Sequence, residues 1–186
     1  MNRFTIFAAT LALSVSHALA EAPRLVLQIT VDGLRADLLP RYRENFVKQG
    51  FNHLLDKGAV YTNAHYLHAN TETIVGHTTL ATGATPAVHG MVGNVWYHEE
   101  SGELGYNIED AEAPLLPTRH DNMEGAQVDP AQKRARSSGR SPRGILAPTF
   151  GDTLKIATDG QSKIFAISGK DRSAVAMAGQ AGTAYW

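Results

Sequence analysis

The chain has 186 residues with 17 Lys and Arg against 18 Asp and Glu, so no basic excess points to a nucleic-acid partner. It contains no cysteine, which excludes disulfides and excludes a thiolate as nucleophile or metal ligand. Any metal site in this chain therefore has to use oxygen and nitrogen ligands.

The first 20 residues have the pattern of a secretory signal peptide. Met1-Asn2-Arg3 supplies a positive charge, residues 4–15 form an apolar run, and Ala18-Leu19-Ala20 is a small-x-small cleavage site. The run is shorter than the roughly 20 residues that cross a bilayer, and no later stretch is long enough either. We expect cleavage after Ala20 and a periplasmic or secreted protein without a membrane span; a buried first helix is the alternative. The mature domain would cover residues 21–186.

An apolar, β-rich run at residues 24–31 (RLVLQITV) predicts a buried strand that ends at Asp32-Gly33. Residues 45–57 carry apolar side chains at partly helical spacing and predict a short helix, with Gly58 at its end. A strand is expected at residues 59–65. These elements would bring Asp32 to the carboxyl end of the first strand.

The next helix is predicted to begin at Thr73 and to close at Thr82-Gly83. Residues 111–143 combine several prolines with a basic run from Lys133 to Arg143. We expect a loop or mobile excursion there, and we interpret its basic run as solvated, with an anion-binding patch as the alternative.

A capped helix over residues 148–157 and a strand over residues 163–168 follow. The alternation of strands and helices indicates an α/β fold with a largely parallel sheet flanked by helices. Ligands of such sheets gather at the carboxyl ends of the strands. We therefore expect Asp32, Thr73 and residues 169–172 to converge.

Asp32 and Thr73 are the first candidates for chemistry. Asp32 offers hard oxygen donors for a divalent cation, and the alternative is a turn formed by Asp32-Gly33. The Thr73 hydroxyl needs a base or a metal to act as a nucleophile near neutral pH. Its place at a helix N-terminus would favour a phosphate group, whereas a plain N-cap role is the alternative.

The surrounding motifs decide between these readings. Residues 71–83 have the pattern T-x-T-x-x-x-H-x-x-x-x-T-G, and His89-Gly90 and the G-N-x-W-Y of residues 93–97 follow. Together with VDGLRAD at residues 31–37, they resemble the alkaline phosphatase superfamily. The resemblance is to the branch that groups one-threonine alkaline phosphatases with type I phosphodiesterases and nucleotide pyrophosphatases.

The resemblance implies a role for each matching residue. Thr73 would be the nucleophile, and Asn94 would contact a phosphoryl oxygen. Lys170 and Arg172 match the Lys-x-Arg element of monoesterases and would bind the phosphate. Asp32 and Thr73 would be ligands of two zinc ions.

The activity implied is hydrolysis of small phosphate monoesters through a phosphothreonine intermediate. A phosphodiesterase or nucleotide pyrophosphatase is the alternative within enzymes. Because a monoester carries one more negative charge than a diester, the two cations Lys170 and Arg172 favour a monoester.

The other zinc ligands of the family are a later Asp-x-x-x-His, an Asp-His pair and a distant His, and they are absent from this chain. We therefore expect an alkaline-phosphatase-like fold that is incomplete at the C-terminus, and no activity from the 186 residues alone. An inactive truncated fragment is the third hypothesis. His68, His77 and His89 do not match metal ligands of the family, and we expect them to be structural.

Overall fold

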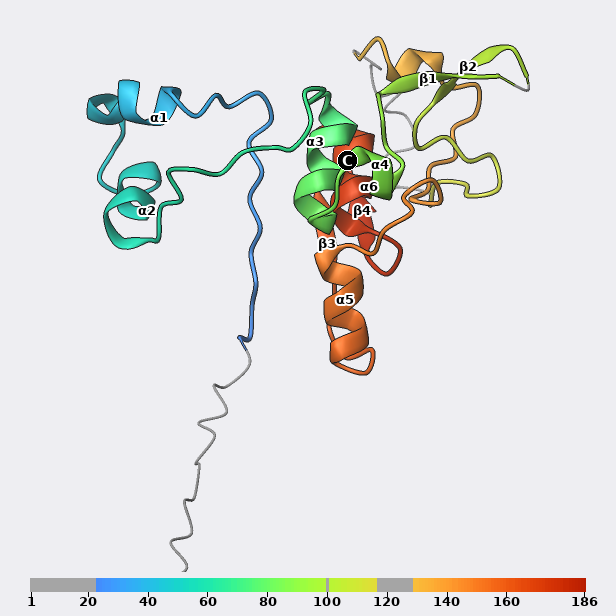
Figure 1. The fold of residues 1–186 in the computed structure, drawn as a ribbon. Helices are drawn as coiled ribbons and strands as arrows, with labels where there is room; N and C mark the ends of the chain where they lie inside the picture. Colours follow the sequence, from blue (N-terminus) through green and yellow to red (C-terminus); the bar gives the residue numbers. More distant parts are fainter. Residues whose placement is uncertain (1–22, 100, 117–128) are drawn as a thin grey trace, which may run out of the picture. The chain divides into compact units, whose positions relative to one another are not determined.

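The computed structural model describes residues 23–99, 101–116 and 129–186, so the predicted signal peptide at residues 1–20 lies outside the described residues. The chain divides into two units, Met1–Thr30 and Val31–Trp186. The helices and strands that the structure describes all belong to the second unit (Figure 1). Within those described ranges, none of the helices combines the length and the apolar character of a membrane span.

The second unit is built mainly from short elements. In chain order they are the helices α1 (Leu38–Arg41), η1 (Arg43–Asn45), α2 (Phe51–Lys57), α3 (Thr73–Thr82) and α4 (Pro86–His89), the strands β1 (Val95–His98) and β2 (Glu103–Tyr106), then η2 (Gln132–Arg134), α5 (Phe150–Ala157), β3 (Phe165–Ile167), α6 (Asp171–Ala178) and β4 (Thr183–Tyr185).

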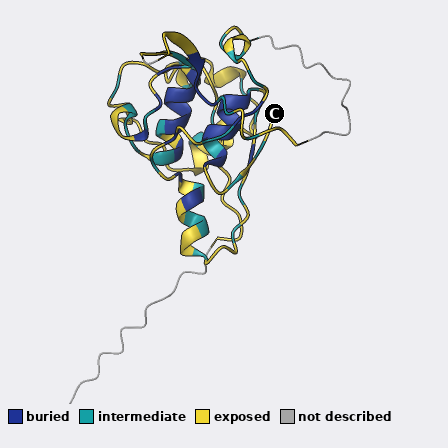
Figure 2. Cartoon of the chain, turned by 90° about the vertical axis from the view of Figure 1, so that its right-hand side faces the viewer, coloured by how far each residue is buried: buried dark blue, intermediate teal, exposed yellow. Residues whose placement is uncertain are grey.

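The core forms where α3 packs on α6 (Figure 1). The first six residues of α3, Thr73–Thr78, are all buried, as expected of a helix surrounded by protein rather than one with a solvent face. Most of α6 is buried as well, and both helices are dark blue in Figure 2. The buried apolar side chains that join them are contributed by both helices and by the segments after them: Ile74, Val75, Met91, Tyr106, Ile108, Ile145, Val175 and Ala176.

Two small sheets flank this core. Strands β1 and β2 form an antiparallel hairpin in which Val95 is opposite Tyr106. Strands β3 and β4 are parallel, with Phe165 opposite Thr183, and α6 is the crossover between them. The β3–α6–β4 unit is thus a piece of the predicted parallel sheet.

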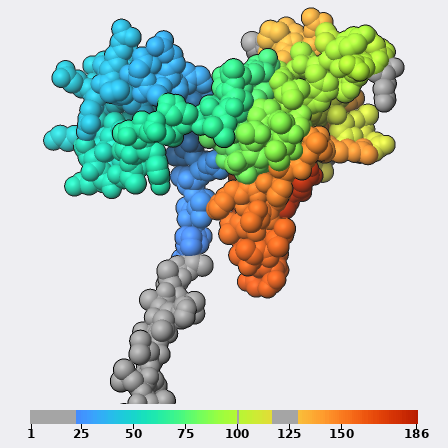
Figure 3. All heavy atoms as spheres, in the orientation of Figure 1, coloured from blue at the N-terminus to red at the C-terminus, as the bar shows by residue number. Residues whose placement is uncertain are grey.

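A capping box fixes the start of α5. The Thr149 hydroxyl accepts the Asp152 N–H at 3.1 Å, and Asp152 Oδ2 accepts the Thr149 N–H at 2.8 Å. The other oxygen of Asp152 accepts the Ala181 N–H at 2.8 Å, which joins the buried start of α5 to the turn before β4. The atoms of α5 (orange) project from the green residues of α3 and α4 in Figure 3.

Several predicted elements are confirmed. Helix α3 begins at Thr73 and ends at Thr82, and Gly83 follows it with the left-handed φ of 69° that favours glycine. Helix α5 and strand β3 lie inside their predicted ranges, whereas α2 begins at Phe51, later than the predicted residue 45. The described parts of residues 111–143 are loop apart from η2.

Two predicted strands are wrong, and several elements were not predicted. Residues 24–31 and 59–65 have no strand structure, and Leu25 and Ile29 are 78% and 71% exposed. A buried strand requires neighbouring strands, and no described strand pairs with either segment. Helix α6 and the β1–β2 hairpin were missed.

Asp152→Ala should lower the free energy of unfolding by about 1–3 kcal/mol, because it leaves the buried Thr149 N–H and the Ala181 N–H without their acceptor. Chemical denaturation measures the loss. The control is Thr153→Ala on the exposed side of the same turn, which should stay within about 0.5 kcal/mol of the parent. Equal losses in both variants would contradict the capping role.

Candidate functional site

Thr73 is the first residue of α3 and is 9% exposed. Its hydroxyl donates to Asp32 Oδ2 at 3.4 Å and accepts from the Arg172 guanidinium at 3.5 Å. The N-cap position belongs to Glu72, so the simple capping role considered for Thr73 is wrong. The hydroxyl instead lies between a carboxylate and a guanidinium.

Asn94 supplies the acceptor at the start of α3. Its Oδ1 accepts the Ile74 N–H at 3.2 Å, and its backbone N–H donates to Glu72 Oε2 at 2.6 Å. Within the described parts of the chain, the side-chain amide nitrogen of Asn94 has no hydrogen-bond partner. Its N–H groups therefore remain as donors next to Thr73.

Lys170 follows β3 and contacts Asp32. Its ammonium donates to Asp32 Oδ2 at 2.7 Å, and both side chains are 41% exposed. This hydrogen bond holds the pKa of Asp32 below its usual value, against the opposing effect of partial burial. An ammonium has three N–H groups, so Lys170 keeps donors for another anion.

Arg172 is almost completely buried in α6. Besides Thr73, it donates to Asp129 Oδ2 at 2.6 Å and to the Tyr106 hydroxyl at 3.5 Å. Burial alone would lower the pKa of Arg172, but the bonds to Asp129 and Tyr106 raise it. Its Nε is buried and has no partner among the described residues, which leaves a cationic donor unpaired.

The residue before Arg172, Asp171, has a buried carboxylate that binds residues from three parts of the chain. Asp171 is 0% exposed, and its oxygens accept from the Tyr106 hydroxyl at 2.6 Å and from Arg140 Nε at 2.8 Å. The Arg172 N–H also donates to Asp171, at 2.7 Å. Burial raises the pKa of Tyr106, so the phenol stays a neutral donor.

Sequence reasoning missed these supporting residues. Arg140 belongs to the basic run interpreted as solvated, and that interpretation is wrong for it because its side chain is 3% exposed in the ion pair with Asp171. Lys133, Arg134, Arg136 and Arg143 are exposed, as expected. One sequence signal for Asp171 was not used: it is a carboxylate between two cations in Lys170-Asp171-Arg172. The sequence around Asp129 contains no signal of its pairing with Arg172.

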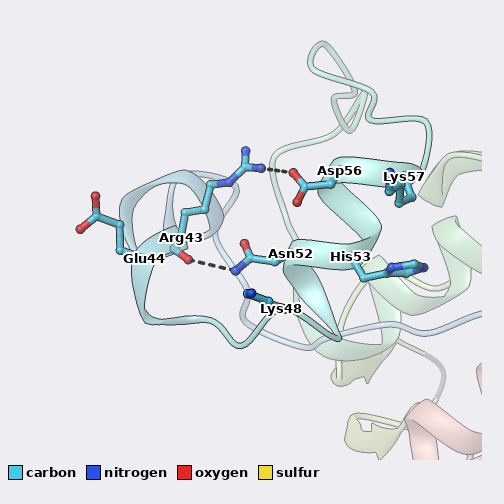
Figure 4. A pocket seen from close by; sticks show the side chains of 7 residues that line it. All are labelled: Arg43, Glu44, Lys48, Asn52, His53, Asp56 and Lys57. Atoms are coloured by element: carbon cyan, nitrogen blue, oxygen red, sulfur yellow. Dashed lines mark hydrogen bonds and ion pairs between the residues drawn. The ribbon is translucent and has the colours of Figure 1, made fainter.

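A depression of about 520 Å³ lies on η1 and α2 and contains none of the predicted site residues. Figure 4 shows the Arg43 side chain reaching Asp56, with which it forms an ion pair, and Asn52 directed at the Arg43 carbonyl oxygen. The Arg43 guanidinium is therefore already paired with a carboxylate.

The oxygens of Asp32 and Thr73 fit a divalent cation in kind. They are too few to hold one, because the described residues contain no group of three or more His, Cys, Asp or Glu with suitable spacing. The expectation of structural histidines is confirmed for His77, whose Nδ1 bonds the Thr73 carbonyl oxygen at 2.7 Å, and for His89, whose Nδ1 accepts the Met91 N–H at 3.1 Å.

Comparisons with known proteins show the family to which the chain belongs. Residues 26–155 match the family of type I phosphodiesterases / nucleotide pyrophosphatases. Alkaline phosphatase PafA of Elizabethkingia meningoseptica is 34% identical over 166 residues, which cover 88% of this chain and 28% of that protein. A calcium-transporting ATPase of Myroides odoratus is 33% identical over 167 residues, covering 89% of this chain and 28% of that protein.

The fold has a solved counterpart. A crystal structure of an alkaline phosphatase PafA variant matches with a TM-score of 0.70 and 30% identity over 84% of this chain and 28% of that chain. This confirms the expected α/β, alkaline-phosphatase-like fold class. The chain spans little more than a quarter of the length of these relatives. Since the family match covers well over half of the chain, the chain belongs to the type I phosphodiesterase / nucleotide pyrophosphatase family, within the alkaline phosphatase superfamily.

Proposed function

We propose that this chain carries the nucleophile and the phosphate-binding side chains of an enzyme that hydrolyses small phosphate monoesters. The observation that carries the proposal is the Thr73 hydroxyl, which lies 3.4 Å from Asp32 and 3.5 Å from Arg172. These residues come from distant parts of the sequence, and Lys170 joins them through Asp32. The relative from Elizabethkingia meningoseptica is named an alkaline phosphatase.

In the proposed reaction, Thr73 Oγ attacks phosphorus while its proton is directed at the Asp32 carboxylate. The Oγ–P bond forms as the ester P–O bond breaks, and the alcohol leaves with a proton. Water then attacks the phosphothreonine and releases inorganic phosphate. The hydrogen bond from Lys170 lowers the pKa of Asp32, so its carboxylate is ionised at neutral pH and accepts the hydrogen bond of the Thr73 hydroxyl.

The charge of the transferred phosphoryl group would be balanced by three side chains. Arg172 directs its Nη2 at Thr73 Oγ, Lys170 keeps two N–H groups, and the Asn94 amide nitrogen lies at the start of α3. Phosphoryl transfer depends mainly on such positioning and charge stabilisation. The N–H groups at the start of the ten-residue helix α3 add to it.

The solved PafA variant supports the same residues. It carries substitutions of one threonine, one asparagine, one lysine and one arginine. Its threonine and asparagine have the same separation along the chain as Thr73 and Asn94, and its lysine and arginine are separated by a single residue, like Lys170 and Arg172.

We also propose that the enzyme uses zinc, with Asp32 and Thr73 among the ligands of two ions. A bound cation would supply positive charge that stabilises the threonine alkoxide. The further ligands would come from outside the described residues. The signal-like first 20 residues support export to the periplasm or the medium.

A phosphodiesterase or nucleotide pyrophosphatase is the second candidate, because the family carries that name. The two reactions share the nucleophile and differ in the charge of the substrate. Lys170 and Arg172 beside Thr73 favour the more highly charged monoester.

Thr73→Ala in the native protein should lower kcat for an aryl phosphate by about 1,000-fold or more, because the attacking oxygen is lost. Thr73→Ser should keep measurable turnover. Thr71→Ala removes an exposed threonine two residues earlier and is the control, expected to match the parent. Turnover by Thr73→Ala at the parental rate would rule out the nucleophile assignment.

Lys170→Ala and Arg172→Ala should each lower kcat/KM for an aryl phosphate by about 100-fold, and should affect a bis-aryl phosphate much less, because the diester carries less charge. Parallel steady-state assays of both substrates measure the difference. Arg134→Ala removes an exposed cation and should change neither value. An equal loss on both substrates would favour the diesterase alternative.

Dialysis of the native protein against a chelator should abolish turnover of the aryl phosphate, and added Zn²⁺ should restore it. Metal content measured before and after dialysis links the loss to zinc. Full turnover by the metal-free protein, or recovery with Mg²⁺ but not Zn²⁺, would contradict the zinc proposal.

A further inference from the structure

Two loops meet at the start of α3, and polar side chains join them. The loop before Thr73 contains Asn70, whose Nδ2 donates to the Val92 carbonyl oxygen at 2.8 Å. It also contains Glu72, whose Oε2 accepts the backbone N–H of Asn94 at 2.6 Å. The position of Asn94 relative to Thr73 therefore depends on how these two loops are held together.

Behind this contact, two histidines and a threonine join the same loops a second time. His89 Nδ1 accepts the Met91 N–H at 3.1 Å, and His89 Nε2 lies 3.0 Å from Thr79 Oγ1. Thr79 Oγ1 is also 2.9 Å from His68 Nε2, and His68 Nδ1 is 2.7 Å from the Asn70 carbonyl oxygen.

The two ends of this series fix the direction of every bond in it. A backbone N–H can only donate, so His89 Nδ1 is the acceptor and the proton of the neutral ring is on Nε2, from where it donates to Thr79. A carbonyl oxygen can only accept, so His68 Nδ1 carries the proton. His68 Nε2 is then the acceptor for the Thr79 hydroxyl proton.

No other protonation state of the two rings satisfies all four hydrogen bonds. A second proton on His89 would place two donors face to face at Met91 N–H, inside a fully buried site. A second proton on His68 would give the Thr79 oxygen two donors and leave the hydroxyl proton of Thr79 without an acceptor. Burial lowers the pKa of His89, which agrees with a neutral ring.

We propose that His68, Thr79 and His89 are positioning residues. Their single directional series of hydrogen bonds holds the Asn70–Glu72 loop against the Met91–Asn94 loop and thereby fixes the Asn94 amide beside Thr73. The inference rests on the proposed function, because the amide matters only if Asn94 binds the phosphoryl group. None of the three residues contacts the reacting atoms in this arrangement.

The first test is the tautomer of each ring. In the protein labelled with ¹⁵N-histidine and held above the ordinary pKa of imidazole, nitrogen–proton correlation spectra should show His68 protonated at Nδ1 and His89 protonated at Nε2. His68→Gln and His89→Gln assign the two sets of signals. Either ring in the opposite tautomer would overturn the proposal.

The second test uses neighbouring threonines of α3. Thr79→Val removes the hydroxyl that both histidines share and keeps the shape of the side chain. Thr78→Val makes the same change at a buried hydroxyl that has no partner among the described residues. Hydrogen exchange of the Asn94 backbone N–H should become about tenfold faster in Thr79→Val. It should not change in Thr78→Val. Equal exchange in the two variants would overturn the proposal.

A double-mutant cycle separates positioning from general stability. Thr79→Val should lower kcat/KM for an aryl phosphate by about tenfold in the parent, but by less than about twofold when Asn94 is already alanine. The same tenfold loss in both backgrounds would overturn the role through Asn94. A protein with the expected tautomers and exchange but without turnover would contradict the proposed function, while the series of hydrogen bonds would stand.

Discussion

The burial of the Asp171 carboxylate is the constraint on which the rest of the site depends. A charge removed from water is tolerated only when its oxygens are paired, and Asp171 obtains partners from Tyr106 at the end of β2 and from Arg140. The Arg140 guanidinium also lies over the Tyr106 ring, 5.1 Å from its centre. Satisfying one carboxylate therefore brings together the hairpin, the loop before α5 and the start of α6.

Once α6 is held in this way, the geometry of the site follows from its packing on α3. Ser173, Ala174 and Ala176 of α6 are all buried, and Ala176 belongs to the same apolar cluster as Ile74 and Val75 of α3. Each helix begins at the site, α3 with Thr73 and α6 with Asp171. The residue after Asp171 is Arg172, so its guanidinium is directed at the first turn of α3.

The sequence was most informative where one short segment determines the structure. The capping pattern of Thr149 and Asp152 and the glycine after Thr82 predicted α5 and α3 because helix ends depend on neighbouring residues. The motifs around Thr73 and Lys170 predicted residues that the structure brings together. The strand at residues 24–31 failed because a strand is defined by its neighbours, which periodicity does not reveal.

The supporting residues were hidden for a related reason. Arg140 lies among exposed cations of the same type, and only a carboxylate 31 residues away distinguishes it from them. Asp129 is likewise an ordinary acidic residue until α6 places Arg172 beside it. Composition and local spacing cannot express such pairings, because they arise only when distant segments have packed.

The contact between Asp129 and Arg172 has a consequence for how tightly the site can hold an anion. The guanidinium already has a carboxylate at 2.6 Å, and this contact lowers the pKa of Asp129, so the acid remains charged. In the proposed enzyme, a phosphoryl group at this guanidinium would meet a cation that already has an anionic partner. The net gain from this contact would be smaller than for an unpaired cation, so Asp129 would limit how tightly both the substrate and the released phosphate are held.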